Sequence, residues 1–131
     1  MKALSLHPFW VMEMMCGDKT IECRTWKTDY RGKLVICASA KRVPGCISGH
    51  ALLICNLVSI EPFTAAHLTA ADMDEMPKKP SYAWILDNIQ QIYPVPVKGK
   101  LHLFDLAIDP VIVPDSISDE AYNAIFDPLY A

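Results

Sequence analysis

The sequence predicts a single α+β domain in which about six short strands form a small, strongly curved barrel or half-barrel, with two or three short helices at its cleft. The first observation is length, because 131 residues fall within the usual size of one domain. The second is a series of short apolar runs, punctuated by glycine and proline, that do not alternate with helices in a βαβ order. The third is composition: 52% of the residues are hydrophobic and 21% are charged, which is typical of a globular chain.

The strands are expected where apolar residues alternate with polar ones or form short continuous runs. The continuous runs at 34–38 and 49–58 predict strands that are covered on both faces. The full set of expected strands is 3–6, 20–26, 34–38, 49–58, 82–92 and 101–108. Of these, 82–92 is expected to end in a turn.

The helices are expected to be short. Residues 9–15 predict one, because Pro8 favours a helix start and Gly17 favours its end. Residues 118–125 predict another, with two acidic residues in the first turn, where they suit the helix dipole. Residues 64–76 are expected to form a loop or a third short helix.

Charge is unevenly distributed along the chain, whose net charge is −3. Residues 1–50 carry +4 and residues 51–131 carry −7, because most of the Lys and Arg residues lie in the first part. The net negative charge argues against a protein that binds long nucleic acid through the phosphate backbone alone. A basic region on an acidic body instead indicates a small or single-stranded anionic ligand, or else an ordinary solvated surface with scattered charges.

The sequence indicates no cofactor, no metal ion and no membrane segment. The five cysteines are scattered without a C-x-x-C pair, and no second ligand pair follows Cys46 and His50, so a zinc site is not expected. No apolar run approaches the roughly 20 residues that cross a bilayer, and the N-terminus lacks the features of a signal peptide. We therefore expect a cytoplasmic protein, and the sequence carries no signal for its oligomeric state.

The segment Gly17–Trp26, GDKTIECRTW, contains the most informative cluster of polar side chains. Lys19 precedes the predicted strand. Glu22, Arg24 and Trp26 follow at a spacing of two, which places them on one face. An ammonium group, a carboxylate, a guanidinium group and an aromatic ring can together bind a phosphate, a base edge and a base face. The alternative is a surface salt-bridge ladder from Lys19 through Glu22 to Arg24, worth at most about 1 kcal/mol.

This cluster belongs to a longer stretch, ALSLHPFW…GDKTIECRTWKTDYRGKLVICAS, which resembles the ASCH domains of the PUA-like superfamily. The resemblance is carried by a short strand, a helix start with Ser, Pro and an aromatic residue, the pattern G-x-K-x-x-E-x-R, and an R-G turn before an apolar strand. Downstream, SYAWILDNIQQIYPVPVKGKLHLFDL is similar to the closing segment of that family. The likeness spans residues 3–106 and leaves 107–131 as a C-terminal extension. It implies a PUA-like curved barrel with a cleft between helices and sheet, and a function in binding RNA or a nucleotide.

The resemblance also implies which residues line that cleft. The candidate ligand-binding residues are Lys19, Glu22, Arg24, Trp26, Tyr30, Arg31, Ser5 and Trp84, while Pro8, Trp10 and Lys98 match the flanking parts of the family pattern. Trp10 and Trp84 are of the kind that can stack on a base, although a buried core position is equally compatible with tryptophan. The expected partner is RNA, a nucleoside or a nucleotide.

Some ASCH proteins hydrolyse N4-acetylcytidine with the motif lysine as a catalytic group, so the resemblance makes Lys19 a candidate catalytic residue. Those enzymes have Thr at the position of Glu22, and the acidic partner would here come from Asp72, Asp74 or Glu75. A carboxylate beside Lys19 favours the charged ammonium, whereas amide hydrolysis by a lysine requires a partly neutral amine. Glu22 could instead act as a general base on water while Lys19 stabilises the oxyanion.

The leading hypothesis is an RNA- or nucleotide-binding domain, and three alternatives stay open. One is the amidohydrolase. Another is a ribonuclease in which Lys19, Arg24 and Tyr30 stabilise the charge of the transition state. The third is a protein-interaction module whose cleft accepts a peptide or an acidic side chain.

Overall fold

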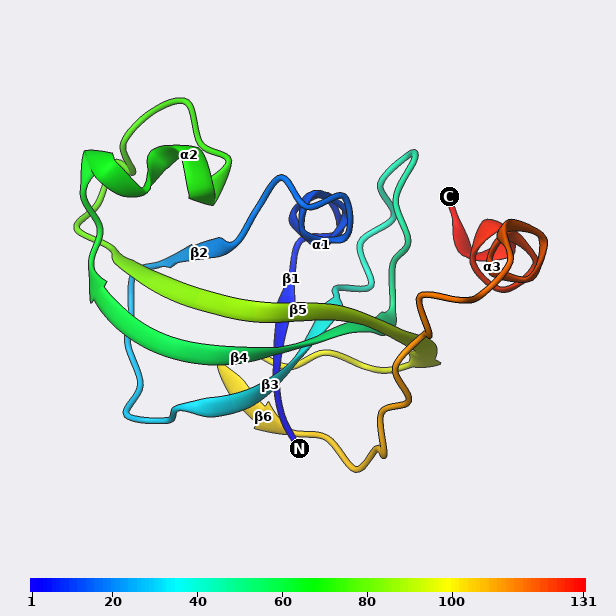
Figure 1. Ribbon diagram of the computed structural model, residues 1–131. Coiled ribbons are helices and arrows are strands. Elements are labelled where there is room, and N and C mark those ends of the chain that lie inside the picture. Colours follow the sequence, from blue (N-terminus) through cyan, green and yellow to red (C-terminus); the bar gives the residue numbers. More distant parts are fainter.

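The computed structural model describes residues 1–131 and contains one curled sheet of six strands in the order β2-β5-β4-β3-β1-β6 (Figure 1). The strands are β1 (Lys2–Leu6), β2 (Ile21–Arg24), β3 (Gly32–Ala38), β4 (His50–Pro62), β5 (Tyr82–Pro96) and β6 (Leu103–Asp105). The helices are α1 (Pro8–Met15), α2 (Leu68–Ala71) and α3 (Asp119–Phe126), with 3₁₀ turns at Ala65–His67 and Asp127–Leu129. The α+β prediction is therefore confirmed, with a half-barrel of six strands and short helices.

The sheet is buried on both faces along β3. Leu34 and Ile36 of this strand belong to one core cluster, while Val35 and Cys37 belong to another, and all four side chains are fully buried. This alternation follows from the period of two along a strand, and it confirms the expectation from the apolar run. β1 lies parallel to β3, with Ala3 paired to Val35, so its first residues fill the same two clusters.

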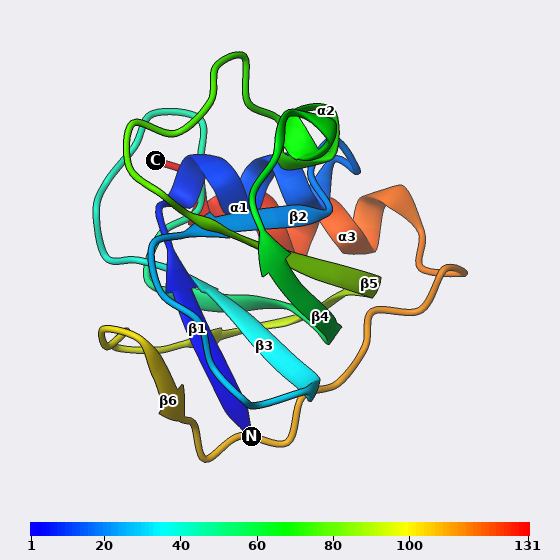
Figure 2. The same ribbon diagram turned by 90° about the vertical axis from the view of Figure 1, so that its left-hand side faces the viewer.

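Figures 1 and 2 show the three helices away from the N-terminus. α1 and α3 pack on one core cluster, whereas α2 packs on a separate cluster with Ile21 and Ala83, on the other face of β2 and β5. Val11 and Met14 of α1 and Phe126 of α3 are buried in the same core cluster as Leu34. α1 begins at Pro8, and the Nδ1 atom of His7 accepts a hydrogen bond from the amide of Phe9.

Four expectations about strand length are wrong. β2 ends at Arg24 instead of residue 26, and β4 continues to Pro62 instead of ending at residue 58. Residues 82–92 were expected to end in a turn, but β5 continues as one strand from Tyr82 to Pro96. Asn88 adopts a positive φ of 48°, and Asn88 and Ile89 lie together opposite the single residue Cys55 of β4. This arrangement is a β-bulge, which bends the strand without reversing it. The turn-like residues therefore add to the curl of the sheet.

The last expected strand, 101–108, is shortened to Leu103–Asp105 because β6 pairs only with the first residues of β1. The C-terminal extension, 107–131, then returns along β5, where the amide of Val113 donates to the carbonyl of Gln91 over 2.9 Å. It ends in α3, whose Ser118 side chain accepts a hydrogen bond from the amide of Ala121. None of the helices is long and apolar enough to cross a membrane.

Two buried thiols predict a loss of stability at alkaline pH. Burial raises the pKa of Cys37 and Cys55 to about 12, from an ordinary value near 9. Because the unfolded chain releases these protons first, the free energy of unfolding is expected to fall by about 1.4 kcal/mol per thiol for each pH unit between about 9 and 12. Urea unfolding at pH 7, 9 and 10 measures this slope. In the Cys37→Ala/Cys55→Ala variant the slope should be shallower, and an unchanged slope would contradict the assignment.

Candidate functional site: a buried ion cluster beneath two neighbouring cavities

Lys19 is almost fully buried, with 1% of its surface exposed, although it lies in the short connection between α1 and β2. Its Nζ atom donates to the carbonyl of Ala71 over 2.7 Å and lies 3.5 Å from Oε1 of Glu22. The same ammonium group is 4.7 Å from the centre of the Trp10 ring, a cation–π distance. Burial lowers the pKa of Lys19 below its ordinary value, even though the charge of Glu22 acts in the opposite direction.

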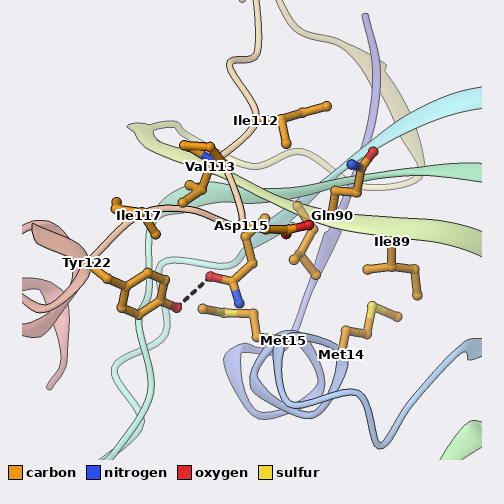
Figure 3. A pocket seen from close by; sticks show the side chains of 12 residues that line it. Met14, Met15, Ile89, Gln90, Ile112, Val113, Asp115, Ile117 and Tyr122 are labelled. Carbon is orange, nitrogen blue, oxygen red and sulfur yellow. Dashed lines mark hydrogen bonds between the residues drawn. The ribbon is translucent and has the colours of Figure 1, made fainter. Parts of the chain in front are cut away.

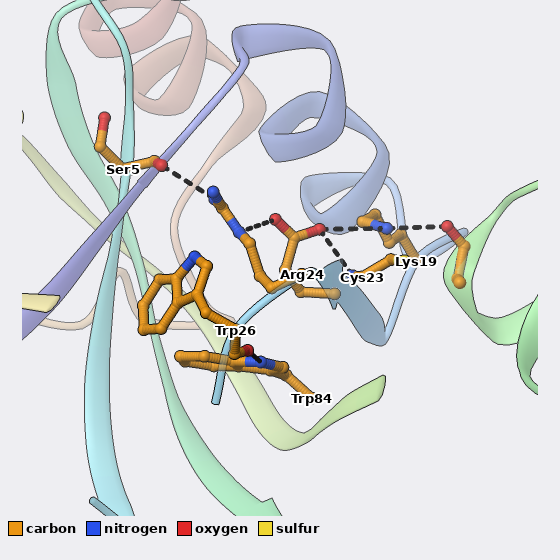
Figure 4. Close-up of polar contacts among 8 residues, drawn as sticks. Ser5, Lys19, Cys23, Arg24, Trp26 and Trp84 are labelled. Atoms are coloured by element: carbon orange, nitrogen blue, oxygen red, sulfur yellow. Dashed lines mark hydrogen bonds and ion pairs between the residues drawn. The ribbon is translucent and has the colours of Figure 1, made fainter. Parts of the chain in front are cut away.

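Glu22 forms an ion pair with each of the two cations of the cluster, Lys19 and Arg24, which Figure 4 labels. Its Oε2 atom lies 2.9 Å from Nε of Arg24, an ion pair that lacks the alignment of a hydrogen bond. Nη2 of Arg24 donates to the carbonyl of Ser5 over 3.0 Å, and the amide of Cys23 donates to Oε1 of Glu22 over 3.2 Å. The pairs of a salt-bridge ladder are thus present, but Lys19 and Glu22 are buried and the cluster carries one net positive charge.

A cavity of about 330 Å³ opens above this cluster, and we call it the inner cavity. It is lined by His7, Trp10, Lys19, Glu22, Cys23, Arg24 and Met73. An aromatic surface, an ammonium group, a carboxylate and a guanidinium group therefore converge on one space. A cavity with a few convergent polar groups and a titratable group of shifted pKa is the typical form of a binding or active site.

A second cavity of about 390 Å³, the outer cavity, adjoins the inner one. The two share His7 and Arg24 as lining residues. The outer cavity lies between the end of β1, the start of the loop after β3, and the loop before β6. Its remaining lining residues are Ser5, Leu6, Ser39, Ala40, Lys98, Gly99, Lys100, Leu101 and His102, so none is acidic.

The family model of the ASCH domain matches residues 4–96, which is most of the chain. The chain belongs to the ASCH domain family. Among solved structures, the ASCH protein of Zymomonas mobilis is similar, with a TM-score of 0.63 and 15% identity over 99% of this chain and 95% of that one. Two mutant forms of that protein give TM-scores of 0.60 and 0.61 at 16% identity, each over 80% of this chain and 88% or 87% of theirs. At this identity the likeness extends to the fold alone, and no curated protein matches the sequence.

In this ASCH domain the two tryptophans expected near the motif do not line either cavity. Trp84 is fully buried, and its Nε1 atom donates to the carbonyl of Trp26 over 3.2 Å. The ring of Trp26 packs edge-on against Trp84 and against His102, at 4.8 Å in both cases. These rings support the loop before β6, and the aromatic surface inside the inner cavity comes from Trp10.

Tyr30 and Arg31 lie in the connection between β2 and β3, outside the lining of both cavities. The Tyr30 hydroxyl donates to the carbonyl of Lys33, and Nη1 of Arg31 donates to the carbonyls of Thr28 and Tyr30. Lys19, Arg24 and Tyr30, the three residues of the ribonuclease alternative, are therefore not brought together around one space. Ser5, by contrast, lines the outer cavity and contributes its carbonyl to Arg24.

Of the three candidate acids, Asp72 lies nearest to the cluster. It follows Ala71, the acceptor of the Lys19 ammonium group, and its charge is one of those that act to raise the pKa of Lys19. A hydrogen bond between the Asp72 and Glu13 carboxyl groups raises the pKa of Glu13. Asp74 and Glu75 are exposed and do not line the inner cavity.

Among the lining residues that sequence reasoning missed are His7, Met73, Lys100 and His102. They come from three separate connections, and no spacing rule links them to the motif. The one available signal was the Lys-Gly-Lys run at 98–100, of which only Lys98 was matched to the family pattern.

A further cavity of about 320 Å³ lies between α1 and the C-terminal extension (Figure 3). Met14 and Met15 form its floor, and Tyr122 closes one side, where the hydroxyl donates to Oε1 of Gln91 over 2.5 Å. Asp115 is the only charged lining residue. This cavity therefore lacks the positive charge that a phosphate group requires, and the ASCH site is the better candidate for an anionic ligand.

Proposed function

We propose that the inner cavity binds a nucleotide or a nucleotide unit of single-stranded RNA. The observation that carries the proposal is the buried Lys19–Glu22–Arg24 cluster beneath a cavity that also contains the face of Trp10. Glu22 can accept a hydrogen bond from a base edge, the two cations can bind anionic or carbonyl oxygens, and Trp10 can stack on a base. Membership of the ASCH family supports the proposal, since these domains are generally regarded as RNA-binding.

The distribution of charge favours a single strand over a long duplex. The cations of the site lie on a chain whose net charge is −3 and whose residues 51–131 are strongly acidic. A long duplex would bring many phosphates close to the acidic surface, whereas a short single strand can enter the cleft alone. The affinity is expected to decrease as salt is raised, with a slope that reflects only a few phosphate contacts.

The Arg24→Ala variant tests this proposal. It is expected to bind a labelled single-stranded RNA hexamer at least about tenfold more weakly, because a charge-assisted contact inside the cavity is lost. Fluorescence polarisation measures the dissociation constant, and Arg31→Ala is the matched control, since Arg31 is an arginine outside both cavities. Equal weakening in both variants would mean general surface electrostatics, and no effect in Arg24→Ala would reject the cavity as the binding site.

A second function, hydrolysis of an N4-acylated cytidine, is favoured by one specific observation. Burial lowers the pKa of Lys19 in spite of the neighbouring carboxylate, so the amine is easier to deprotonate than an exposed lysine. The neutral Lys19 amine would act as the general base on the attacking water and would pass that proton to the N4 amine of cytidine as it leaves. Incubation with N4-acetylcytidine tests this activity: cytidine and acetate should appear with the wild-type protein and be absent with Lys19→Ala. Absence of turnover in the wild type would leave the binding function alone.

A further inference from the structure

We propose that the outer cavity is a phosphodiester site, which makes the ligand a strand of at least two nucleotides rather than a free nucleoside. The inference rests on the proposed function of the inner cavity and specifies its ligand class. An RNA strand whose base lies in the inner cavity has its next phosphate group a short distance along its backbone. The outer cavity is the neighbouring space that could accept this phosphate. Arg24 lines both spaces, so it stands between the base and the phosphate.

The charge of the outer cavity supports this assignment. Lys98, Lys100 and Arg24 line it, and no carboxylate does. Glu22, the carboxylate that contacts Arg24, lines the inner cavity and is already paired with both Lys19 and Arg24. A concave surface that carries only positive charge, in a chain of net charge −3, is a strong local attractor for a phosphate.

The loop that carries the two lysines is anchored at both ends and passes close to Ser5 in its middle. The amide of Val97 donates to the carbonyl of Gly49 over 3.0 Å at its start, and the His102 ring packs on Trp26 at its end. In the middle, Gly99 lies so close to Ser5 that an added Cβ would be 2.5 Å from the Ser5 hydroxyl oxygen. A preorganised loop loses little entropy on binding, which favours a specific phosphate site over a mobile pair of surface lysines.

The test compares the Lys98→Ala/Lys100→Ala variant with Lys78→Ala/Lys79→Ala, which removes the same charge from an exposed loop outside both cavities. Two readouts are needed: the dissociation constant of a single-stranded RNA hexamer as a function of salt, and the NMR shift of the Trp10 indole on addition of the four common nucleosides. We expect the first variant to bind RNA at least about tenfold more weakly with a reduced salt slope. The control should stay within about twofold, and the nucleoside-induced shift should persist in both.

The two ideas fail separately. If Lys98→Ala/Lys100→Ala binds RNA as the wild type does while nucleosides still shift the Trp10 signal, the phosphate site is wrong and the proposed function stands. If neither RNA nor nucleosides perturb Trp10 in the wild type, the proposed function is wrong, and the inference with it.

A pair of variants without any change of charge tests the same loop. Gly99→Ala should displace the loop from Ser5 and weaken RNA binding although both lysines remain. Adding Ser5→Ala removes the hydroxyl oxygen at 2.5 Å and leaves only the Ser5 Cβ at 3.0 Å, so the double variant should regain part of the affinity. Wild-type affinity in Gly99→Ala would contradict a role for the fixed loop.

Discussion

Replacement of Glu22 by alanine is expected to destabilise the protein by about 3–5 kcal/mol, because it leaves two neighbouring cations without a counter-charge. Lys19 is 1% exposed and cannot move into water without leaving the carbonyl of Ala71 and the ring of Trp10. Arg24 is tied to the carbonyl of Ser5 and lies 2.9 Å from the carboxylate that would be lost. Urea unfolding followed by fluorescence measures the change.

Two further variants separate charge from shape. Glu22→Gln keeps the size of the side chain but removes its negative charge, so most of the loss should remain if electrostatics dominates. The double variant Lys19→Met/Glu22→Gln also removes one of the two cations. Its free energy of unfolding should therefore fall by less than that of Glu22→Gln alone. Losses that simply add would contradict the electrostatic explanation and would point to packing.

Much of the fold follows from local rules that the sequence displays. The run 34–38 was expected to be buried on both faces, and its alternation between two core clusters follows directly from strand geometry. Pro8 and Gly17 bracket α1 as capping preferences require. The turn expected at the end of 82–92 is absent because a residue with positive φ, here Asn88, can either reverse a chain or form a bulge, and the pairing with β4 decides between them.

The site was predictable only in part, because its depth depends on residues far apart in the sequence. The motif identified Lys19, Glu22 and Arg24 as neighbours on one face, and that neighbourhood is present. Local spacing gave no indication that Lys19 is buried, because the residues that contact its ammonium group are Trp10 on α1 and Ala71 at the end of α2. Burial changes the energetics of the cluster. Exposed ion pairs contribute little to stability, whereas desolvated charges depend strongly on their partners.

The position of the aromatic residue was wrong for a similar reason. A period of two along the strand placed Trp26 beside Arg24, but β2 ends at Arg24 and the chain leaves the sheet there. Trp26 therefore turns to Trp84 and His102, and a tryptophan from the helix takes the place above Lys19. A strand rule applies only as far as the strand extends, and the length of β2 is set by its pairing with β5.

Lys19→Met should produce the opposite result to the loss of Glu22: a stability within about 1 kcal/mol of the wild type, together with loss of ligand binding or turnover. The carbonyl of Ala71 loses its donor, but the folded state no longer buries an ammonium group, and Glu22 keeps its pair with Arg24. RNA binding and N4-acetylcytidine turnover measure the function, and Lys27→Met provides a control on an exposed lysine. Strong destabilisation by Lys19→Met would show that the lysine is structural.

The pH dependence of stability gives an independent check on the same residue. Because burial lowers the pKa of Lys19, the unfolded state binds its proton at pH values where the folded state has released it. The contribution of Lys19 to the free energy of unfolding therefore rises with pH. The rise occurs between the lowered pKa of the folded state and the ordinary value of about 10.4 in the unfolded state. The buried thiols act in the opposite direction in the same range, so the quantity to follow is the difference between the wild type and Lys19→Met. That difference should shift in favour of the wild type as pH rises, and a constant difference would mean that the amine remains charged. A lysine whose pKa is lowered by burial, at the floor of a cavity with a carboxylate and a guanidinium group, is typical of a binding or active site.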